Sequence, residues 1–254
     1  MEIVGKSRLS EAVKNYLQRI NRERVDLQAA LIDMDGTLYD SMPRHAEAWR
    51  LMTSELGITL PIDDFFRFEG RTGASTINII FQRAFGRNAT EREVHDLYER
   101  KKELFNAMPS VSVMPGAQRM INILKSAGVM RVLVTGSGQN TLLNRLNTDF
   151  PEGFSDDLRV TSRDVKIGKP SPEPYLKAMS MAGVLAWQCI VIENAPLGVE
   201  SGHAAGIFTI GVTTGPLKSD ELMAAGADIT FDSMTEFADR LPDLITVFNS
   251  TYIH

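Results

Sequence analysis

Short apolar runs alternate with amphipathic segments along most of the chain. Runs rich in Val, Ile, Leu and Ala are typical of buried strands and occur at residues 29–32, 131–135, 158–161, 189–192, 208–212 and 229–231. Helical spacing of apolar residues follows most of these runs, at residues 117–127, 142–146, 174–182, 199–205, 220–225 and 234–249. The alternation predicts an α/β fold, a doubly wound and mostly parallel sheet with helices on both faces.

One stretch, residues 41–113, breaks the alternation. It contains helical patterns at 44–56, 74–85 and 90–108 but no convincing strand, and prolines stand near both edges, at Pro43 and Pro115. We therefore expect an all-helical cap inserted after the first strand. The α/β core would then consist of residues 27–40 and 114–254.

The first 26 residues contain a further amphipathic helix, predicted over residues 6–24. An apolar stripe at helical spacing comprises Leu9, Val13, Tyr16, Leu17 and Ile20. We expect this stripe to pack on the body of the same chain, with a dimer contact as the alternative. A monomer is the expected state.

Composition limits the classes of protein to which the chain can belong. Its 43% hydrophobic and 23% charged residues are ordinary for a globular protein, and a net charge of −5 predicts no nucleic-acid partner. Cys189, the single cysteine, excludes an intrachain disulfide and indicates a reducing compartment. Because there is no apolar run for a membrane span or a signal peptide, we expect a cytoplasmic protein without a membrane partner.

The sequence Asp33-Met34-Asp35-Gly36-Thr37 directly follows the first predicted strand. In an open α/β sheet, ligands bind at the carboxyl ends of strands. A bend permitted by Gly36 would turn Asp33 and Asp35 toward one substrate, where one carboxylate attacks and the other moves a proton. The alternative for such a short motif is a helix N-cap or a solvated turn.

Three other strand ends carry polar groups. The hydroxyl of Thr135 and the backbone of Gly136 and Ser137 can bind phosphate oxygens, although many strand–helix turns look similar. Lys169, fixed beside Pro170, can place its positive charge against the carboxylates. The alternative is that it is a surface residue, since a lone lysine usually serves solubility.

The fourth strand end carries Glu193 and Asn194. Their oxygens, together with those of Asp33 and Asp35, suit Mg²⁺, and the alternative is a helix N-terminus rich in polar residues.

An Asp-x-Asp-Gly-Thr motif, a strand-end Thr, a Lys-Pro pair and an acidic strand end, in this order, resemble the motifs of the haloacid dehalogenase superfamily. The resemblance runs from about residue 29 to residue 231, and the cap resembles that of the β-phosphoglucomutase-like phosphatases. It implies that Asp33 forms an aspartyl-phosphate and that Asp35 acts as acid and base. It also implies that Thr135 and Gly136 bind the phosphoryl group and that Lys169 neutralises its charge.

The resemblance further implies a Mg²⁺ cofactor and a small phosphorylated substrate. The metal would be held by Asp33, the Asp35 carbonyl and the Glu193–Asn194 pair. His45, in the first cap segment, resembles a family histidine that couples cap closure to proton transfer, with a structural role as the alternative.

The cap loop 68–73 departs from the mutase pattern. Where mutases carry cations for a second phosphate, this chain has Glu69, Gly73 and Gly138, so mutase activity is not expected, although Arg71 compensates in part. A carboxylate over a phosphate site is unfavourable unless a cation lies between them.

Glu69 would therefore bind the metal, directly or through water. Together with Asn194 it resembles the inorganic pyrophosphatase of this branch. Pyrophosphate is the leading substrate, and a sugar-phosphate phosphatase or phosphohexomutase is the alternative. A receiver-like module phosphorylated on Asp33 is disfavoured, because receivers lack a helical cap.

Overall fold

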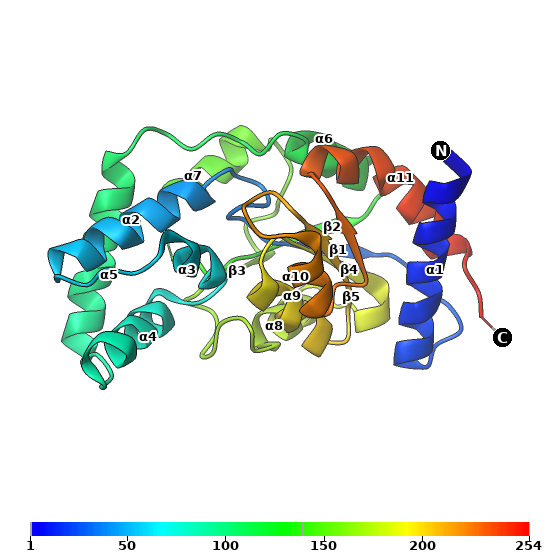
Figure 1. Cartoon of the computed structure of the whole chain (residues 1–254). Helices are drawn as coiled ribbons and strands as arrows, with labels where there is room; N and C mark the ends of the chain where they lie inside the picture. Colours follow the sequence, from blue (N-terminus) through cyan, green and yellow to red (C-terminus); the bar gives the residue numbers. More distant parts are fainter. Residues whose placement is uncertain (1, 139, 254) are drawn as a thin grey trace.

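A single parallel sheet forms the centre of the molecule (Figure 1). The computed structural model describes residues 2–138 and 140–253, and within them six strands pair in the order β3-β2-β1-β4-β5-β6. The strands are β1 Ala29–Ile32, β2 Met130–Val134, β3 Arg159–Val160, β4 Cys189–Glu193, β5 Phe208–Val212 and β6 Ile229–Phe231. All described pairings are parallel, which confirms the predicted doubly wound fold.

Helices cover both faces of the sheet. Around the core they are α1 Glu2–Ile20, α6 Ala117–Ser126, α7 Asn140–Asp149, α8 Glu173–Ala182, α9 Pro196–Ala204, α10 Ser219–Ala224, α11 Met234–Ser250 and the 3₁₀ turn η1 Ala186–Gln188. Strand residues alternate between the two layers: Ile32 packs in the layer that contains α6 and α11, and Leu31 packs against α8. Cys189 lies in the second layer, fully buried, as its apolar surroundings in the sequence predicted.

The strand order places a crevice beside β1. The chain runs from β1 outward to β2 and β3, then returns to the other side of β1 to form β4. The loops that follow β1 and β4 therefore leave the sheet in opposite directions. Such a switch point opens the ligand site of a doubly wound sheet at its carboxyl edge.

The helical cap stands at this edge (Figure 1). Its helices are α2 Met42–Glu55, α3 Ile62–Arg67, α4 Gly73–Phe85 and α5 Glu91–Ala107. Helix α3 was not predicted, because its six residues are too few to show a clear period. The two linkers to the core lie side by side: Asp40 N–H donates to the Ser112 carbonyl at 3.0 Å, and Met114 N–H donates to the Leu38 carbonyl at 2.9 Å.

Helix α1 packs on the opposite end of the core, against α11 (Figure 1). Val13, Tyr16 and Leu17 are fully buried there. The Tyr16 ring meets Phe208 edge to face at 5.4 Å, and its hydroxyl donates to the carbonyls of Ala186 and Gly206. The apolar stripe thus faces its own chain. No helix within residues 2–138 and 140–253 has the length and apolar character to cross a membrane.

The burial of α1 predicts a measurable stability contribution. Leu17→Ala removes a fully buried side chain from this contact and should lower the free energy of unfolding by about 2–5 kcal/mol. Urea denaturation followed by circular dichroism measures this change. Glu11→Ala, on the exposed face of the same helix, is the control and should change stability by less than about 0.5 kcal/mol. Equal midpoints for both variants would show that α1 does not belong to the cooperative core.

Candidate active site

The turn after β1 brings the two aspartates to one cavity. Gly36 has a φ of 79°, in the left-handed region, and the N–H groups of Thr37 and Leu38 fold back onto the Met34 carbonyl. Asp33 and Asp35 are 4% and 8% exposed, and both line the same cavity between core and cap. The predicted bend therefore occurs where the sequence placed it, and it turns both carboxylates toward the cap side of the sheet.

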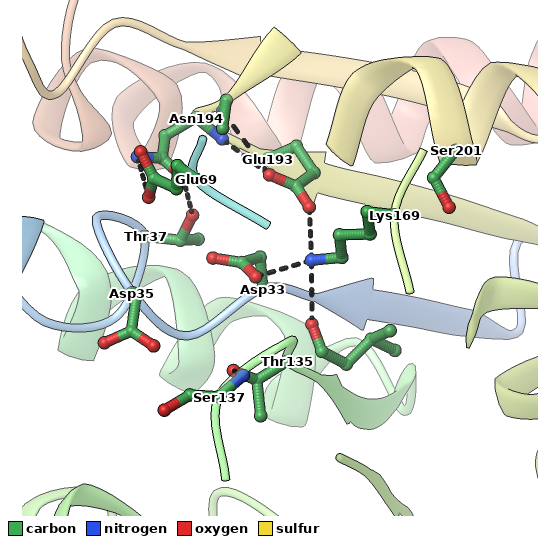
Figure 2. Close-up of polar contacts among 12 residues, drawn as sticks. Asp33, Asp35, Thr37, Glu69, Thr135, Ser137, Lys169, Glu193, Asn194 and Ser201 are labelled. Atoms are coloured by element: carbon green, nitrogen blue, oxygen red, sulfur yellow. Dashed lines mark hydrogen bonds and ion pairs between the residues drawn. The ribbon is translucent and has the colours of Figure 1, made fainter. Parts of the chain in front are cut away.

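Lys169 lies at the centre of the polar contacts (Figure 2). Its ammonium donates to Asp33 Oδ1 at 2.6 Å, to Glu193 Oε1 at 2.5 Å and to the Val134 carbonyl at 3.1 Å. Although burial alone would lower the pKa of Lys169, the charges of Asp33 and Glu193 raise it, so the side chain stays charged. Lys166, the other lysine of this loop, is exposed.

Glu193 is committed to contacts within the protein. Besides Lys169, its Oε1 accepts a hydrogen bond from the Tyr175 hydroxyl at 2.7 Å. Its Oε2 accepts from the backbone N–H groups of Asn194 and Ala195, at 3.1 and 3.4 Å. Both oxygens are thus engaged. Glu193 therefore holds the Lys169 ammonium in place beside Asp33.

Asn194 connects the core to the cap. Its Oδ1 accepts from the Thr37 hydroxyl at 3.3 Å, and its Nδ2 donates to Glu69 Oε1 at 2.9 Å (Figure 2). Burial raises the pKa of Glu69 well above its usual range, and the neighbouring charge of Asp33 raises it further. The cap loop thus brings a carboxylate to the site, as the sequence suggested, and seats it on the amide that follows β4.

The phosphate loop, residues 135–138 after β2, lies directly beneath the cap loop. Thr135 is buried, and its Oγ1 accepts from Ser137 N–H at 3.0 Å. A Cβ at Gly136 would stand 2.5 Å from the Gly70 carbonyl oxygen, so only glycine allows this approach. Arg71 lines the cavity and donates to the Ser75 hydroxyl at 3.3 Å.

His45 takes a place beside Asp35. Its Nε2 lies 2.9 Å from Asp35 Oδ1, which also accepts from the Ser41 hydroxyl at 2.7 Å. The Nδ1 atom of His45 lies 2.6 Å from the ammonium of Lys101, a buried residue of α5. A neutral imidazole with its proton on Nε2 satisfies both contacts, since Nδ1 then accepts and Nε2 donates.

The pKa shifts agree with this assignment. Burial and the charge of Lys101 lower the pKa of His45, despite the opposing effect of Asp35. Burial would raise the pKa of Asp35, but His45, Ser41 and the charge of Lys101 outweigh it and lower the pKa. Burial lowers the pKa of Lys101 itself to about 7.

Sequence reasoning overlooked Lys101, Tyr175 and Tyr98. Lys101 could have been identified from the sequence, because it interrupts the apolar stripe of α5 between Leu97 and Phe105. A charged residue at a buried helical position usually has a partner. Tyr175 lies at an ordinary core position of α8, and nothing in the sequence separates it from a packing residue.

The donor set fits a divalent cation. Asp33 and Glu193 share the ammonium of Lys169, and Glu69 is a third carboxylate close enough for their charges to raise its pKa. Burial raises the pKa of Asp33 to about 8. The charge of Glu193 adds to this rise, and the charge of Lys169 opposes it. A buried site with this deficit of positive charge favours a cation.

The number of side-chain ligands is small. In residues 2–138 and 140–253, no three His, Cys, Asp or Glu side chains are grouped as a metal site. An Asp33 carboxylate, the Asp35 carbonyl and the Asn194 amide oxygen are hard ligands, and Mg²⁺ needs few protein ligands because it keeps several waters.

Comparison with known proteins agrees with this geometry. Residues 27–206 match the model of the haloacid dehalogenase-like hydrolases. A phosphorylated carbohydrates phosphatase of Thermotoga maritima is 30% identical over 203 residues, which cover 79% of this chain and 92% of that protein. The β-phosphoglucomutase of Bacillus subtilis is 26% identical over 223 residues, covering 83% of this chain and 95% of that protein.

A solved structure from Bacteroides vulgatus, described as a "putative beta-phosphoglucomutase", is 46% identical. It superimposes with a TM-score of 0.93 over 96% of this chain and 100% of the other. The chain therefore belongs to the haloacid dehalogenase-like hydrolases. Within them it falls in the β-phosphoglucomutase-like phosphatase branch. None of these three relatives carries the name of a pyrophosphatase.

Proposed function

We propose that this chain is a Mg²⁺-dependent phosphohydrolase that acts on a small phosphorylated substrate through an aspartyl-phosphate on Asp33. The observation that carries the proposal is the contact of 2.6 Å between Lys169 and Asp33, with the second carboxylate of Asp35 on the same cavity. Lys169 orients the nucleophile, and one of the Asp33 oxygens has no part in that contact.

In the first step, the free carboxylate oxygen of Asp33 attacks phosphorus and the bond to the leaving oxygen breaks. The buried Thr135 and the N–H group of Gly136 bind the transferring oxygens. Asp35 has a lowered pKa, so it must first take up a proton, which it then gives to the leaving oxygen. In the second step, Asp35 takes a proton from water, water oxygen attacks phosphorus, and the bond to Asp33 breaks to release orthophosphate.

His45, Ser41 and Lys101 support Asp35 in both steps. His45 and Ser41 contact the same oxygen of Asp35, which leaves the other oxygen available for proton transfer. His45 and Lys101 belong to the cap, so the support for Asp35 is complete only with the cap in place. Proton transfer is thereby coupled to cap closure.

Mg²⁺, when bound, would neutralise charge on the phosphoryl oxygens. Asp33, the Asp35 carbonyl and Asn194 would hold it. The contacts of Glu193 favour an indirect role for that residue, since both of its oxygens are already engaged.

The position of the Glu69 carboxylate is the reason to prefer pyrophosphate as the substrate. This partly buried carboxylate accepts a hydrogen bond from Asn194 and lies close enough to Asp33 and Glu193 for their charges to raise its pKa. A metal-chelated diphosphate would bring the cation that relieves this repulsion. The cavity, at about 60 Å³, is also small.

A sugar-phosphate phosphatase is the second candidate. The related phosphatase of Thermotoga maritima bears the name of phosphorylated carbohydrates. The cap side of the cavity includes the aromatic side chains of Trp49, Phe65 and Phe68, and such rings stack well on sugar faces.

The assignment of the two aspartates is directly testable. Asp33→Asn should abolish phosphate release, because a neutral amide is a poor nucleophile. Asp35→Asn should lower kcat by roughly 10²–10⁴-fold while leaving KM close to that of the parent protein. Asp40→Asn, an exposed aspartate a few residues further on, is the matched control and should keep full activity. Full turnover by either of the first two variants contradicts the mechanism.

Removal of metal provides another test. Protein treated with excess chelator should release no phosphate, and Mg²⁺ should restore the activity. Ca²⁺ should restore it poorly, because Ca²⁺ prefers more ligands in a looser shell. Malachite-green detection of orthophosphate measures all three states. Undiminished turnover in excess chelator would exclude the metal from the reaction.

Glu69→Ala separates the two candidate substrates. If Glu69 serves a metal-chelated diphosphate, the change should lower kcat/KM for pyrophosphate by roughly 10–100-fold, the scale of one charged hydrogen bond. Hydrolysis of p-nitrophenyl phosphate, which needs only the core residues, should fall far less.

Two variants serve as controls for Glu69. Glu69→Gln keeps an acceptor for the Asn194 amide but removes the charge, so it should resemble Glu69→Ala if the charge matters. Asp63→Ala, at an exposed position of α3, should leave both activities unchanged. An equal fall for the two substrates would remove the reason to prefer pyrophosphate.

A further inference from the structure

Tyr98 extends from the cap helix α5 to the phosphate loop of the core. Its phenolic oxygen accepts a hydrogen bond from Gly138 N–H at 3.3 Å. The partly buried side chain also lines the cavity that contains Asp33 and Asp35. A bulky ring thus forms part of the cavity wall where cap and core meet.

Gly73 makes room for this ring, and Gly138 lies at ordinary contact distance from its hydroxyl. A Cβ at Gly73, the first residue of α4, would overlap the Tyr98 ring. Gly73 does not have a positive φ, so the backbone does not require glycine there, whereas the ring does. On the core side, a Cβ at Gly138 would lie 3.6 Å from the Tyr98 hydroxyl.

The ring is also held from its sides. The Lys102 ammonium lies 5.5 Å from the ring centroid, and the Trp49 ring is tilted against it with centroids 6.4 Å apart. With the hydroxyl tied to Gly138, the side chain has contacts at its tip and on its ring. Tyr98 therefore forms a fixed wall and has little freedom to yield to a ligand.

We propose that Tyr98 sets the upper size of the leaving group. The space left beside this wall, with the cap on the core, is small, at about 60 Å³. This space admits a phosphoryl group with a compact partner. A hexose ring would have to displace Tyr98 or keep the cap from closing. The inference rests on the proposed phosphohydrolase function and adds a steric selection to it.

Tyr98→Ala tests the wall. The probes are acetyl phosphate, with a compact leaving group, and glucose 6-phosphate, with a bulky one. The ratio of kcat/KM for glucose 6-phosphate over acetyl phosphate should rise about 10–100-fold in Tyr98→Ala. Tyr98→Phe keeps the ring and should hold the ratio within about twofold. His95→Ala, exposed on the same helix, is the control and should keep the parent values.

Gly73→Ala provides an independent route to the same result. The added methyl group should push the Tyr98 ring aside and raise the ratio without any change at Tyr98 itself. In the Tyr98→Ala background, Gly73→Ala should have no further effect, because the ring it displaces is gone. If Tyr98→Ala does not fold, as judged by thermal unfolding, Tyr98→Leu and Gly73→Ala carry the test.

The outcomes separate the inference from the function on which it rests. A ratio that stays at the parent value in folded Tyr98→Ala or Tyr98→Leu and in Gly73→Ala overturns the size limit, as does an equal loss for both substrates. If the parent protein turns over neither probe and does not turn over pyrophosphate, the phosphohydrolase function and the inference are overturned together. Turnover of acetyl phosphate without turnover of pyrophosphate removes only the choice of pyrophosphate.

Discussion

The ammonium of Lys169, buried between two carboxylates, is the charge on which the site depends. It joins Asp33 at the end of β1 to Glu193 at the end of β4, at 2.6 and 2.5 Å. Removal of one partner from such a buried pair typically costs about 3–5 kcal/mol, because the remaining charge stays uncompensated. Two strand ends and the loop before α8 are therefore held in one arrangement, and the nucleophile is oriented before any substrate arrives.

The same arrangement explains why the site requires further positive charge. With Glu193 engaged by Lys169, Tyr175 and two backbone N–H groups, Asp33 shares its only described ammonium with another acid. Glu69 adds a further carboxylate when the cap is seated on the core. Burial then raises the pKa of both Asp33 and Glu69. In the proposed function, a cation and the phosphorylated substrate that arrives with it would relieve the repulsion among these carboxylates.

The core and the cap divide the chemistry between them. In the proposed mechanism the core supplies the groups that touch the phosphoryl group, and members of the same branch have names that span phosphatases and a mutase. The cap supplies His45, Lys101, Glu69 and Tyr98, which support Asp35 or border the leaving group. It approaches the core through backbone, with the Gly70 carbonyl against Gly136, so the cap lies this close to the core only because position 136 carries glycine. Specificity is thus decided in a separate unit from the reaction.

The sequence by itself determined the order of the strands along the chain, the helical insertion and the strand-end residues. These features are local: apolar runs mark strands, and Asp33, Thr135, Lys169 and Glu193 stand at positions set by those runs. Only the tertiary structure decided how distant residues meet. It paired Lys101 with His45 across 56 positions, turned Glu193 toward Lys169, and placed the Tyr98 ring against Gly73. No local pattern encodes such contacts, because they depend on how the cap packs and on which face of each helix is buried.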